Sequence, residues 1–339
     1  MIIFYGEGRL GNQVLQYQLL TRLIREHGDS SPPHDMDGSV ALSPDGPVAT
    51  IARKAQHRRI LAAGLENLHD VFEFSGVQLY VLTRNGRIKQ LVKHVLMPWL
   101  LRPLARGMRL ASYVSEEMER VDGRRDYTGR VFSHKGLTDA LLLVDHGYFH
   151  NARVPLRLFP LEGLSLRPSL RKEASEWLQQ RLAGSACVPV FVHVRRGDYA
   201  QHSDFGLTGL MLPTAYYRAA IARIRETIQR PHFIIVSDEP DWAAREFADL
   251  SPCTISRGSE ALDFAVMSLC PAGVLANSTF SLAAALMMGN PRIVLAPKYW
   301  FGFRVNQWYP PRIRFHHPAI EYVEVPCQQR ARIQPGSAR

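Results

Sequence analysis

The sequence has 339 residues, of which 46% are hydrophobic and 21% are charged, a composition typical of globular proteins. Its length favours two domains, and it has no run of about 18 apolar residues that would predict a transmembrane helix. The net charge of +10 favours anionic partners, which could be nucleic acid, acidic lipid or a phosphorylated substrate. Four scattered cysteines without a CxxC pair, and an N-terminus without signal-peptide features, predict a cytoplasmic protein with reduced thiols.

The first half of the sequence opens with a strand, a glycine-rich turn and a helix. Apolar residues 2–5 predict the strand, and the helical periodicity of residues 12–26 follows the turn. Residues 29–47 are rich in Ser, Pro, Asp and Gly and predict a loop. Residues 141–144 predict a later strand, so the half has an α/β pattern that is interrupted in its middle.

The second half alternates strands with helices. Strands are predicted at residues 188–194, 233–236 and 273–276, near Thr254, and last at residues 293–296. Helices are predicted at residues 172–182, 216–224, 260–269 and 279–288, and after Pro240. Near-continuously apolar strands between helices predict an α/β fold with a parallel sheet covered on both faces. The unpatterned residues 161–171 place the boundary between domains 1–165 and 166–339.

The most informative segment, HVRRGDY, follows an apolar strand. Ligands of open parallel sheets bind outside the carboxyl ends of the strands, and the guanidinium fork fits phosphate oxygens. His193, Arg195 and Asp198 are therefore candidate catalytic residues, and Arg195 and Arg196 are a candidate phosphate clamp. Asp198 could fix one of these arginines or act as a base. The alternative is a solvated Arg–Asp pair at a strand end.

Two further strand ends carry polar residues. Asp238 could accept hydrogen bonds from a base or ribose, or it could cap the helix after Pro240. The second strand end leads into an Ala-rich helix whose free N–H groups could bind an anion, although plain capping is an equal alternative. Its candidate residues are Asn277, Ser278, Thr279, Phe280 and Ser281.

Two motifs are typical of other functions, but their positions in the sequence do not suit those functions. Gly6–Gly11 satisfies GxGxxG after a strand, the fingerprint of an NAD-dependent dehydrogenase, but no acidic residue ends a second strand about 20 residues on. Asp35 and Asp37 form a DxD that could hold a divalent metal, but they lie in a loop-like segment, so we expect no metal site. Signatures of zinc peptidases, P-loop kinases and serine hydrolases are absent.

Basic residues gather at positions 53–59 and 84–109. The second group mixes Lys and Arg with Leu, Val and Trp99, which predicts peripheral contact with the anionic inner face of a membrane. The alternative is a helix pair with solvated basic faces. A nucleic-acid-binding protein is a further interpretation of the charge, but the basic residues are mostly not interleaved with aromatic ones.

Five segments, in this order, resemble the family-11 glycosyltransferases, which are typified by alpha-1,2-fucosyltransferases. GRLGNQVLQY at residues 8–17 is similar to their opening turn and helix, and DHGYFH at 145–150 to a later turn. HVRRGDY at 193–199 matches their HxRxxD-type motif, and SDEPDW at 237–242 resembles a strand end of the family. ANSTFS at 276–281 is close to the form common in bacterial members.

The resemblance implies a glycosyltransferase-B fold, in which two Rossmann-like domains face a cleft, with the acceptor side in 1–165 and GDP-fucose in 166–339. It implies that Arg195 binds the β-phosphate, supported by His193 and Arg196. The implied donor-binding residues are Arg9, Gly11, Asn12, Arg195, Arg196, Asp238, Asn277, Ser278, Thr279, Phe280 and Ser281. The implied reaction is inverting transfer of L-fucose to a glycan hydroxyl, alpha-1,2 to galactose, in lipopolysaccharide or glycan biosynthesis, without cofactor or metal.

The resemblance leaves the base and the acceptor open. Asp198, Asp204 and Glu7 are the candidate bases. Leu282 and Ala283 stand where many relatives carry tryptophans, so a fucosyltransferase of another linkage or acceptor is an alternative.

Overall fold

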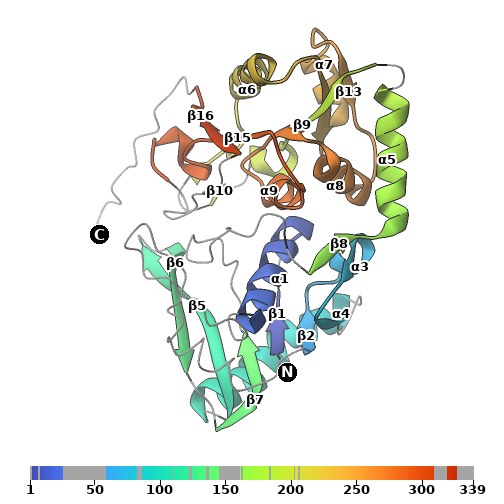
Figure 1. The fold of residues 1–339 in the computed structure, drawn as a ribbon. Coiled ribbons are helices and arrows are strands. Elements are labelled where there is room, and N and C mark those ends of the chain that lie inside the picture. The colour runs from blue at the N-terminus through green and yellow to red at the C-terminus, as the bar shows by residue number, and fades with distance from the viewer. Residues whose placement is uncertain are drawn as a thin grey trace, which may run out of the picture. The chain divides into compact units, whose positions relative to one another are not determined.

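The structure is a computed structural model and describes residues 2–6, 8–25, 59–81, 86–108, 110–121, 124–134, 137–144, 161, 163–182, 185–201, 203–204, 207–308 and 319–326. Contacts between residues divide the chain into two compact units. Unit 1 holds most of the residues before 166, and the main body of unit 2 begins at Leu166. Figure 1 labels the elements of both units.

Unit 1 is built on a six-stranded sheet with the order β4-β2-β1-β7-β5-β6. The pairs β1/β2, β1/β7, β2/β4 and β5/β7 are parallel. The elements are β1 (Ile2–Tyr5), α1 (Leu10–Arg25), β2 (Arg59–Ala63), α3 (Leu68–Val71), β3 (Phe72–Phe74), β4 (Gln78–Val81), α4 (Gly86–Leu91), β5 (Ala111–Val121), β6 (Arg124–His134), β7 (Thr138–Val144) and β8 (Leu164–Leu166), which pairs with β3.

The turn between β1 and α1 requires glycine. Gly8 has φ of +96°, and a Cβ atom there would lie 2.2 Å from Asn12 Nδ2. The Gly6 N–H donates to Ala63 O at 2.7 Å, which ties the turn to the end of β2. The predicted first strand is confirmed, and the helix begins at Leu10 rather than at residue 12.

α4 continues into two π-helical stretches, Val92–Leu101 and Pro103–Gly107. The backbone N–H groups of Arg102 and Met108 donate to carbonyls five residues back, which is the π-helical pattern. One side of this segment is buried against the sheet of unit 1. The buried cluster consists of Tyr5, Ala63, Val92, Met97, Ala105, Ala111, Tyr113 and Leu143.

Unit 2 is built on a six-stranded sheet with the order β13-β12-β9-β14-β15-β16, and all neighbouring strands are parallel. In chain order this is 3-2-1-4-5-6, the Rossmann order, so the predicted α/β class is confirmed. The elements are α5 (Pro168–Leu182), β9 (Val188–Val194), β10 (Ser203–Asp204), β11 (Leu207–Thr208), α6 (Thr214–Thr227), β12 (Pro231–Ser237), α7 (Pro240–Glu246), β13 (Cys253–Ile255), α8 (Glu260–Leu269), β14 (Ala272–Val274), α9 (Thr279–Leu286), β15 (Ile293–Pro297) and β16 (Ile320–Val323), with short 3-10 turns at Gly197–Ala200 and Phe301–Arg304.

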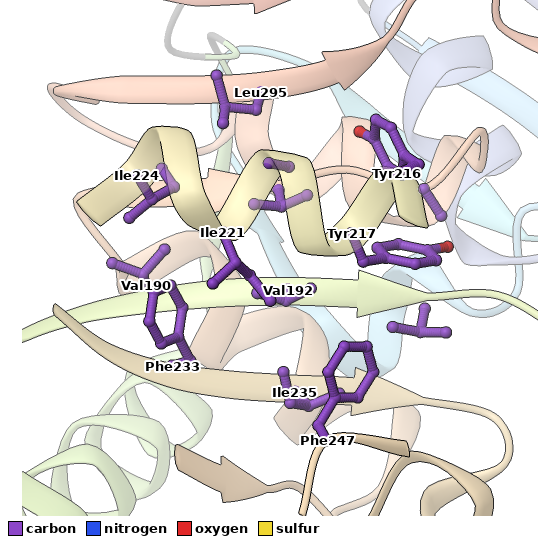
Figure 2. Close-up of a cluster of buried hydrophobic side chains, with 14 of the residues drawn as sticks. Val190, Val192, Tyr216, Tyr217, Ile221, Ile224, Phe233, Ile235, Phe247 and Leu295 are labelled. Carbon is purple, nitrogen blue, oxygen red and sulfur yellow. The ribbon is translucent and has the colours of Figure 1, made fainter. Parts of the chain in front are cut away.

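Both faces of this sheet are buried, as expected of parallel strands between helices. Val190 and Val192 of β9 pack in one cluster with Tyr217 and Ile221 of α6, which lies along the sheet in Figure 2. Phe191 lies between the two valines, so it points to the opposite face, where it is also fully buried.

The structure also differs from the predicted strands of unit 2. The predicted last strand is followed by β16, which pairs in parallel with β15. The four residues of β16 are only half-buried, so their sequence lacks the apolar run of an inner strand. β14 ends at Val274 rather than at Ala276, and the Leu275 N–H still donates to Leu295 O of β15 at 2.8 Å.

Cys187, Cys253 and Cys270 are free thiols in the described part of the chain. Among the residues that the structure describes, no helix is both long enough and apolar enough to cross a membrane.

Candidate functional site

Polar side chains follow three neighbouring strands of unit 2. β9 lies between β12 and β14, and these strands lead to Arg195, Asp238 and Asn277 respectively. β9 and β14 are the first and fourth strands in chain order, so the strand order reverses between them. Ligands of doubly wound sheets bind at this switch point, outside the carboxyl ends of the strands. The predicted residues of unit 2 therefore gather where a ligand is expected.

Arg195 is held by two carboxylates. Its Nη2 lies 2.6 Å from Asp198 Oδ1, and its Nη1 lies 3.1 Å from Asp238 Oδ2. The guanidinium carbon is 5.5 Å from the centre of the Tyr199 ring, and the side chain is 15% exposed. These contacts fix the plane of the guanidinium group. A group fixed in this way can present its other N–H donors to phosphate oxygens with little loss of conformational entropy.

Arg196 has partners of its own beside the same strand end. Its backbone N–H donates to Asp238 Oδ1 at 3.0 Å, and its Nε donates to Glu239 Oε2 at 3.0 Å. The guanidinium carbon lies 3.7 Å from the centre of the Trp242 ring, a cation–π distance. Asp238 thus joins both arginine residues to the end of β12. Its predicted contact with a nucleotide stays a prediction.

Glycine at position 197 lets this cluster form. A Cβ atom on Gly197 would lie 2.6 Å from Asp238 Oδ2, closer than real Cβ contacts. Any larger residue would push the Asp238 carboxylate away from Arg195. The sequence motif therefore includes a small residue because of a contact with another strand.

His193 is buried and neutral. It is 3% exposed, and its Nδ1 atom has no hydrogen-bond partner among the described residues. Burial, and secondarily the charge of Arg195, lowers the pKa of His193 to about 3. An imidazole with this pKa is a poor proton acceptor near neutral pH. Its ring can still donate or accept a hydrogen bond, which suits ligand contact better than proton transfer.

The turn before α9 is internally hydrogen-bonded. Ser278 is the N-cap and its Oγ accepts from the Phe280 N–H at 3.3 Å, while Ser281 Oγ donates to Ser278 O at 3.2 Å. Tyr199 OH donates to Asn277 O at 3.2 Å, which links the turn to the motif after β9. The Ser278 hydroxyl thus performs the capping role that the sequence left as an alternative, and the Ser281 hydroxyl bonds the carbonyl of the capping residue. Ligand binding by these residues and by Thr279 stays a prediction.

Asp263 is a half-buried carboxyl group near the strand ends of unit 2, and no motif in the sequence had indicated it. It lies on α8, after β13, and accepts a hydrogen bond from Ser256 Oγ at 2.5 Å. Burial raises the pKa of Asp263 to about 6, against a smaller opposite effect of the Ser256 hydrogen bond. A carboxyl group so placed can accept N–H donors from a heterocycle. The only sequence signal was an acidic residue within an apolar helix.

The remaining predicted residues lie in unit 1 or outside the described residues. Arg9 is exposed just before α1, Gly11 is buried in its first turn, and Asn12 is half-buried beside Gly8. Their contact with the donor stays a prediction. Glu7, Asp35, Asp37 and residues 145–150 lie outside the described residues, and Asp204 is described only as part of β10. Within the described ranges, no three His, Cys, Asp or Glu residues are grouped as metal ligands.

Solved structures of fucosyltransferases show a distant likeness. A structure of POFUT1 in complex with GDP-fucose covers 87% of this chain and 97% of its own, with 15% identity and a TM-score of 0.41. NodZ alpha-1,6-fucosyltransferase soaked with GDP-fucose covers 86% and 93%, with 10% identity and a TM-score of 0.42. A TM-score below 0.5 is too low to establish a shared fold, so the α/β assignment rests on the strand orders.

Sequence relatives are closer. Galactoside 2-alpha-L-fucosyltransferase SEC1 of Bos taurus is 29% identical over 175 residues, which are 50% of this chain and 46% of the relative. O-antigen biosynthesis glycosyltransferase WbnK of Escherichia coli is 34% identical over 115 residues, 32% of this chain and 38% of the relative. Galactoside alpha-(1,2)-fucosyltransferase 1 of Saimiri boliviensis boliviensis is 33% identical over 159 residues, 44% and 42% of the two chains. The matched regions span less than half the length of these relatives.

The family itself is identified by a sequence model. The sequence model of Glycosyl transferase family 11 matches residues 136–306, half of the chain. This region contains β9, β12 and β14. It also contains the arginine cluster, which consists of Arg195, Arg196, Asp198, Asp238 and Glu239. The chain belongs to glycosyl transferase family 11.

Proposed function

We propose that the protein transfers L-fucose from GDP-beta-L-fucose to a hydroxyl group of a glycan. The observation that carries the proposal is Arg195, fixed by Asp198 and Asp238 at the switch point of the Rossmann-ordered sheet. Membership of glycosyl transferase family 11 supports the reaction type. The names of the relatives from Bos taurus and Saimiri boliviensis boliviensis, both fucosyltransferases, support fucose as the transferred sugar.

The proposed reaction inverts the configuration at the sugar. The acceptor oxygen forms a bond with C1 of fucose, while the bond from C1 to the β-phosphate oxygen breaks and its electron pair leaves with GDP. The acceptor proton passes to a base, for which Asp198, Asp204 and Glu7 are candidates. Negative charge grows on the diphosphate in the transition state, and the Arg195 guanidinium and the N-terminus of α9 are suited to stabilise it.

The finer parts of the proposal concern the acceptor and the pathway. We infer alpha-1,2 transfer to galactose from the names of the two galactoside fucosyltransferases. We infer a role in glycan biosynthesis of the O-antigen kind from the name of WbnK. Domain 1–165 would contact the acceptor and domain 166–339 the donor, with Arg9, Gly11 and Asn12 reaching the donor from the first domain.

The donor nucleotide can be tested by thermal shift with GDP, GDP-fucose, GDP-mannose, UDP and NAD in parallel. A ligand that binds the native state at about 100 times its Kd stabilises it by about 2.7 kcal/mol. We expect GDP and GDP-fucose to raise the melting temperature most. Stabilisation by NAD alone would instead favour a dehydrogenase and contradict the proposal.

The proposed reaction needs no metal, because guanidinium groups and helix N–H groups take over the charge stabilisation. Fucosyl transfer should therefore survive saturating EDTA. The measurement is the initial rate with and without chelator. Complete loss of transfer with EDTA and its recovery with manganese would show that a metal site, such as one at Asp35 and Asp37, had been wrongly dismissed.

A further inference from the structure

The segment formed by α4 and the two π-helical stretches is apolar on two sides. Val92, Met97 and Ala105 are buried in the cluster against the sheet of unit 1. On the outer side Leu91, Val95 and Trp99 are exposed, and Trp99 is 79% exposed. A helical segment with apolar residues on two sides normally has both of these sides buried. The outer side of this segment is therefore an apolar surface without a cover among the described residues.

Three of the exposed apolar residues are spaced along one side of this segment. Leu91, Val95 and Trp99 follow each other at intervals of four residues, which keeps them on one side of a helical segment. Leu100, Met108 and Leu110 are also exposed and lie between Trp99 and the start of β5 in the sequence. We call this set of six residues the outer stripe. Isolated exposed hydrophobic residues need no explanation, but a continuous set marks an interaction surface.

The formal charges in the sequence of this segment have a single sign. Residues 86–110 contain six basic side chains and no acidic one. The basic residues are Arg87, Lys89, Lys93, Arg102, Arg106 and Arg109. Apolar and aromatic residues together with Lys and Arg are the composition of helices that lie in the interface of an anionic membrane.

We propose that the outer stripe binds the surface of an anionic lipid bilayer, with Trp99 inserted at the level of the headgroups. A second copy of the chain fits this surface less well, since two such faces would bring like charges together. A nucleic acid would use the basic residues but would leave the aliphatic part of the stripe exposed. An anionic bilayer satisfies both the apolar surface and the charge.

The test is co-sedimentation of the full chain with vesicles of phosphatidylcholine alone and with added phosphatidylglycerol. Each cationic side chain near an anionic surface strengthens binding about fivefold, so we expect at least about tenfold more binding to the anionic vesicles. In about 1 M salt the Debye length falls to about 3 Å, and most of this preference should disappear. Equal binding to both vesicles, or none to either, would overturn the proposal.

Two variants with the same change of charge locate the contact. Trp99→Glu should reduce binding to anionic vesicles at least about tenfold. Leu137→Glu is the matched control, because Leu137 also belongs to unit 1 and is 83% exposed but lies outside the outer stripe. Equal loss in both variants would overturn the proposal. If Trp99→Glu lowers the melting temperature, Leu91→Glu repeats the test about two turns earlier.

Sedimentation without lipid tests whether a second copy of the chain covers the outer stripe instead. We expect a monomer under the same conditions. A dimer that Trp99→Glu abolishes would show that a second copy covers the stripe, and this would overturn the lipid assignment. No donor or acceptor is present in these measurements, so their outcome is independent of the proposed function.

Discussion

Arg195 is the residue on which most of the proposed chemistry depends. It is charged and only 15% exposed, and both of its described ion pairs are with residues at strand ends rather than in the core. Its removal should therefore affect the reaction more than the fold. The two roles can be separated by measuring activity and stability on the same preparation.

We expect Arg195→Ala to lower kcat by at least about a hundredfold, with little change in melting temperature. Arg195→Lys should restore only part of the rate, because an ammonium group keeps the charge but lacks the bidentate fork. Arg218→Ala is the matched control, because Arg218 lies on α6, outside the site, and forms an ion pair with Asp249 at 2.7 Å. Normal turnover per folded Arg195→Ala molecule would refute the phosphate clamp.

His193 predicts a dependence of stability on pH. In the folded chain its pKa is about 3, whereas an unfolded histidine has a pKa of about 6.5. Below pH 6.5 only the unfolded chain takes up this proton. The contribution of His193 to the free energy of unfolding is therefore fully present above that pH and is lost as the pH falls toward 3. The loss should reach about 1.4 kcal/mol near pH 5.5, one unit below the unfolded pKa.

The measurement compares chemical denaturation of the wild type and His193→Gln at about pH 8 and pH 5.5. The variant cannot take up the proton, so its stability should fall less between the two pH values. His232→Gln is the control, because burial lowers the pKa of His232 as well but to a smaller extent. An equal fall in wild type and His193→Gln would show that His193 is not held neutral.

At the scale of elements, the contact between Asp238 and Arg195 depends on the distance between the end of β12 and the turn after β9. Asp238 reaches Arg195 only because no side chain intervenes at Gly197. We expect Gly197→Ala to lower transfer activity at least about tenfold, since it displaces the carboxylate that orients the guanidinium. Gly289→Ala is the control, because a Cβ atom there meets no atom within 4 Å. Full activity of Gly197→Ala would mean that the orientation by Asp238 is dispensable.

Elements with strong local patterns could be predicted from the sequence. The helix at residues 260–269 and the strand at 188–194 were located at their observed bounds, because an N-cap serine and an uninterrupted apolar run mark them. β16 could not be found, since its residues are half-buried. The π-helical stretches were also missed, because their hydrogen bonds depend on packing and on the prolines at 98 and 103.

The candidate site was predictable only in part, for a related reason. Arg195, Asp198 and Asn277 could be placed at strand ends from local sequence alone. The contact between Arg195 and Asp238 depends on β12 lying beside β9, which is a property of the strand order. Asp263 was missed because its burial results from the packing of α8, and no local pattern reports that.

At the scale of the whole molecule, the proposal assigns the donor mainly to unit 2. Hydrogen–deuterium exchange with and without GDP can test this assignment on the intact chain. We expect the strongest added protection at residues 195–200, 237–242 and 276–281, where the strand ends of unit 2 lie. Protection restricted to the turn at residues 6–12 would contradict the assignment and would move the nucleotide to unit 1.

The ion pairs of the arginine cluster also affect how tightly a product is held. Asp198, Asp238 and Glu239 surround two guanidinium groups, so the anionic groups outnumber the cationic ones. A diphosphate that approaches Arg195 must compete with the carboxylates that already occupy two of its nitrogen atoms. Binding is then an exchange of one anion for another, and its free energy is the difference between two pairings. In the proposed reaction, return of the carboxylates to the same donors would favour departure of GDP after transfer, at the expense of affinity.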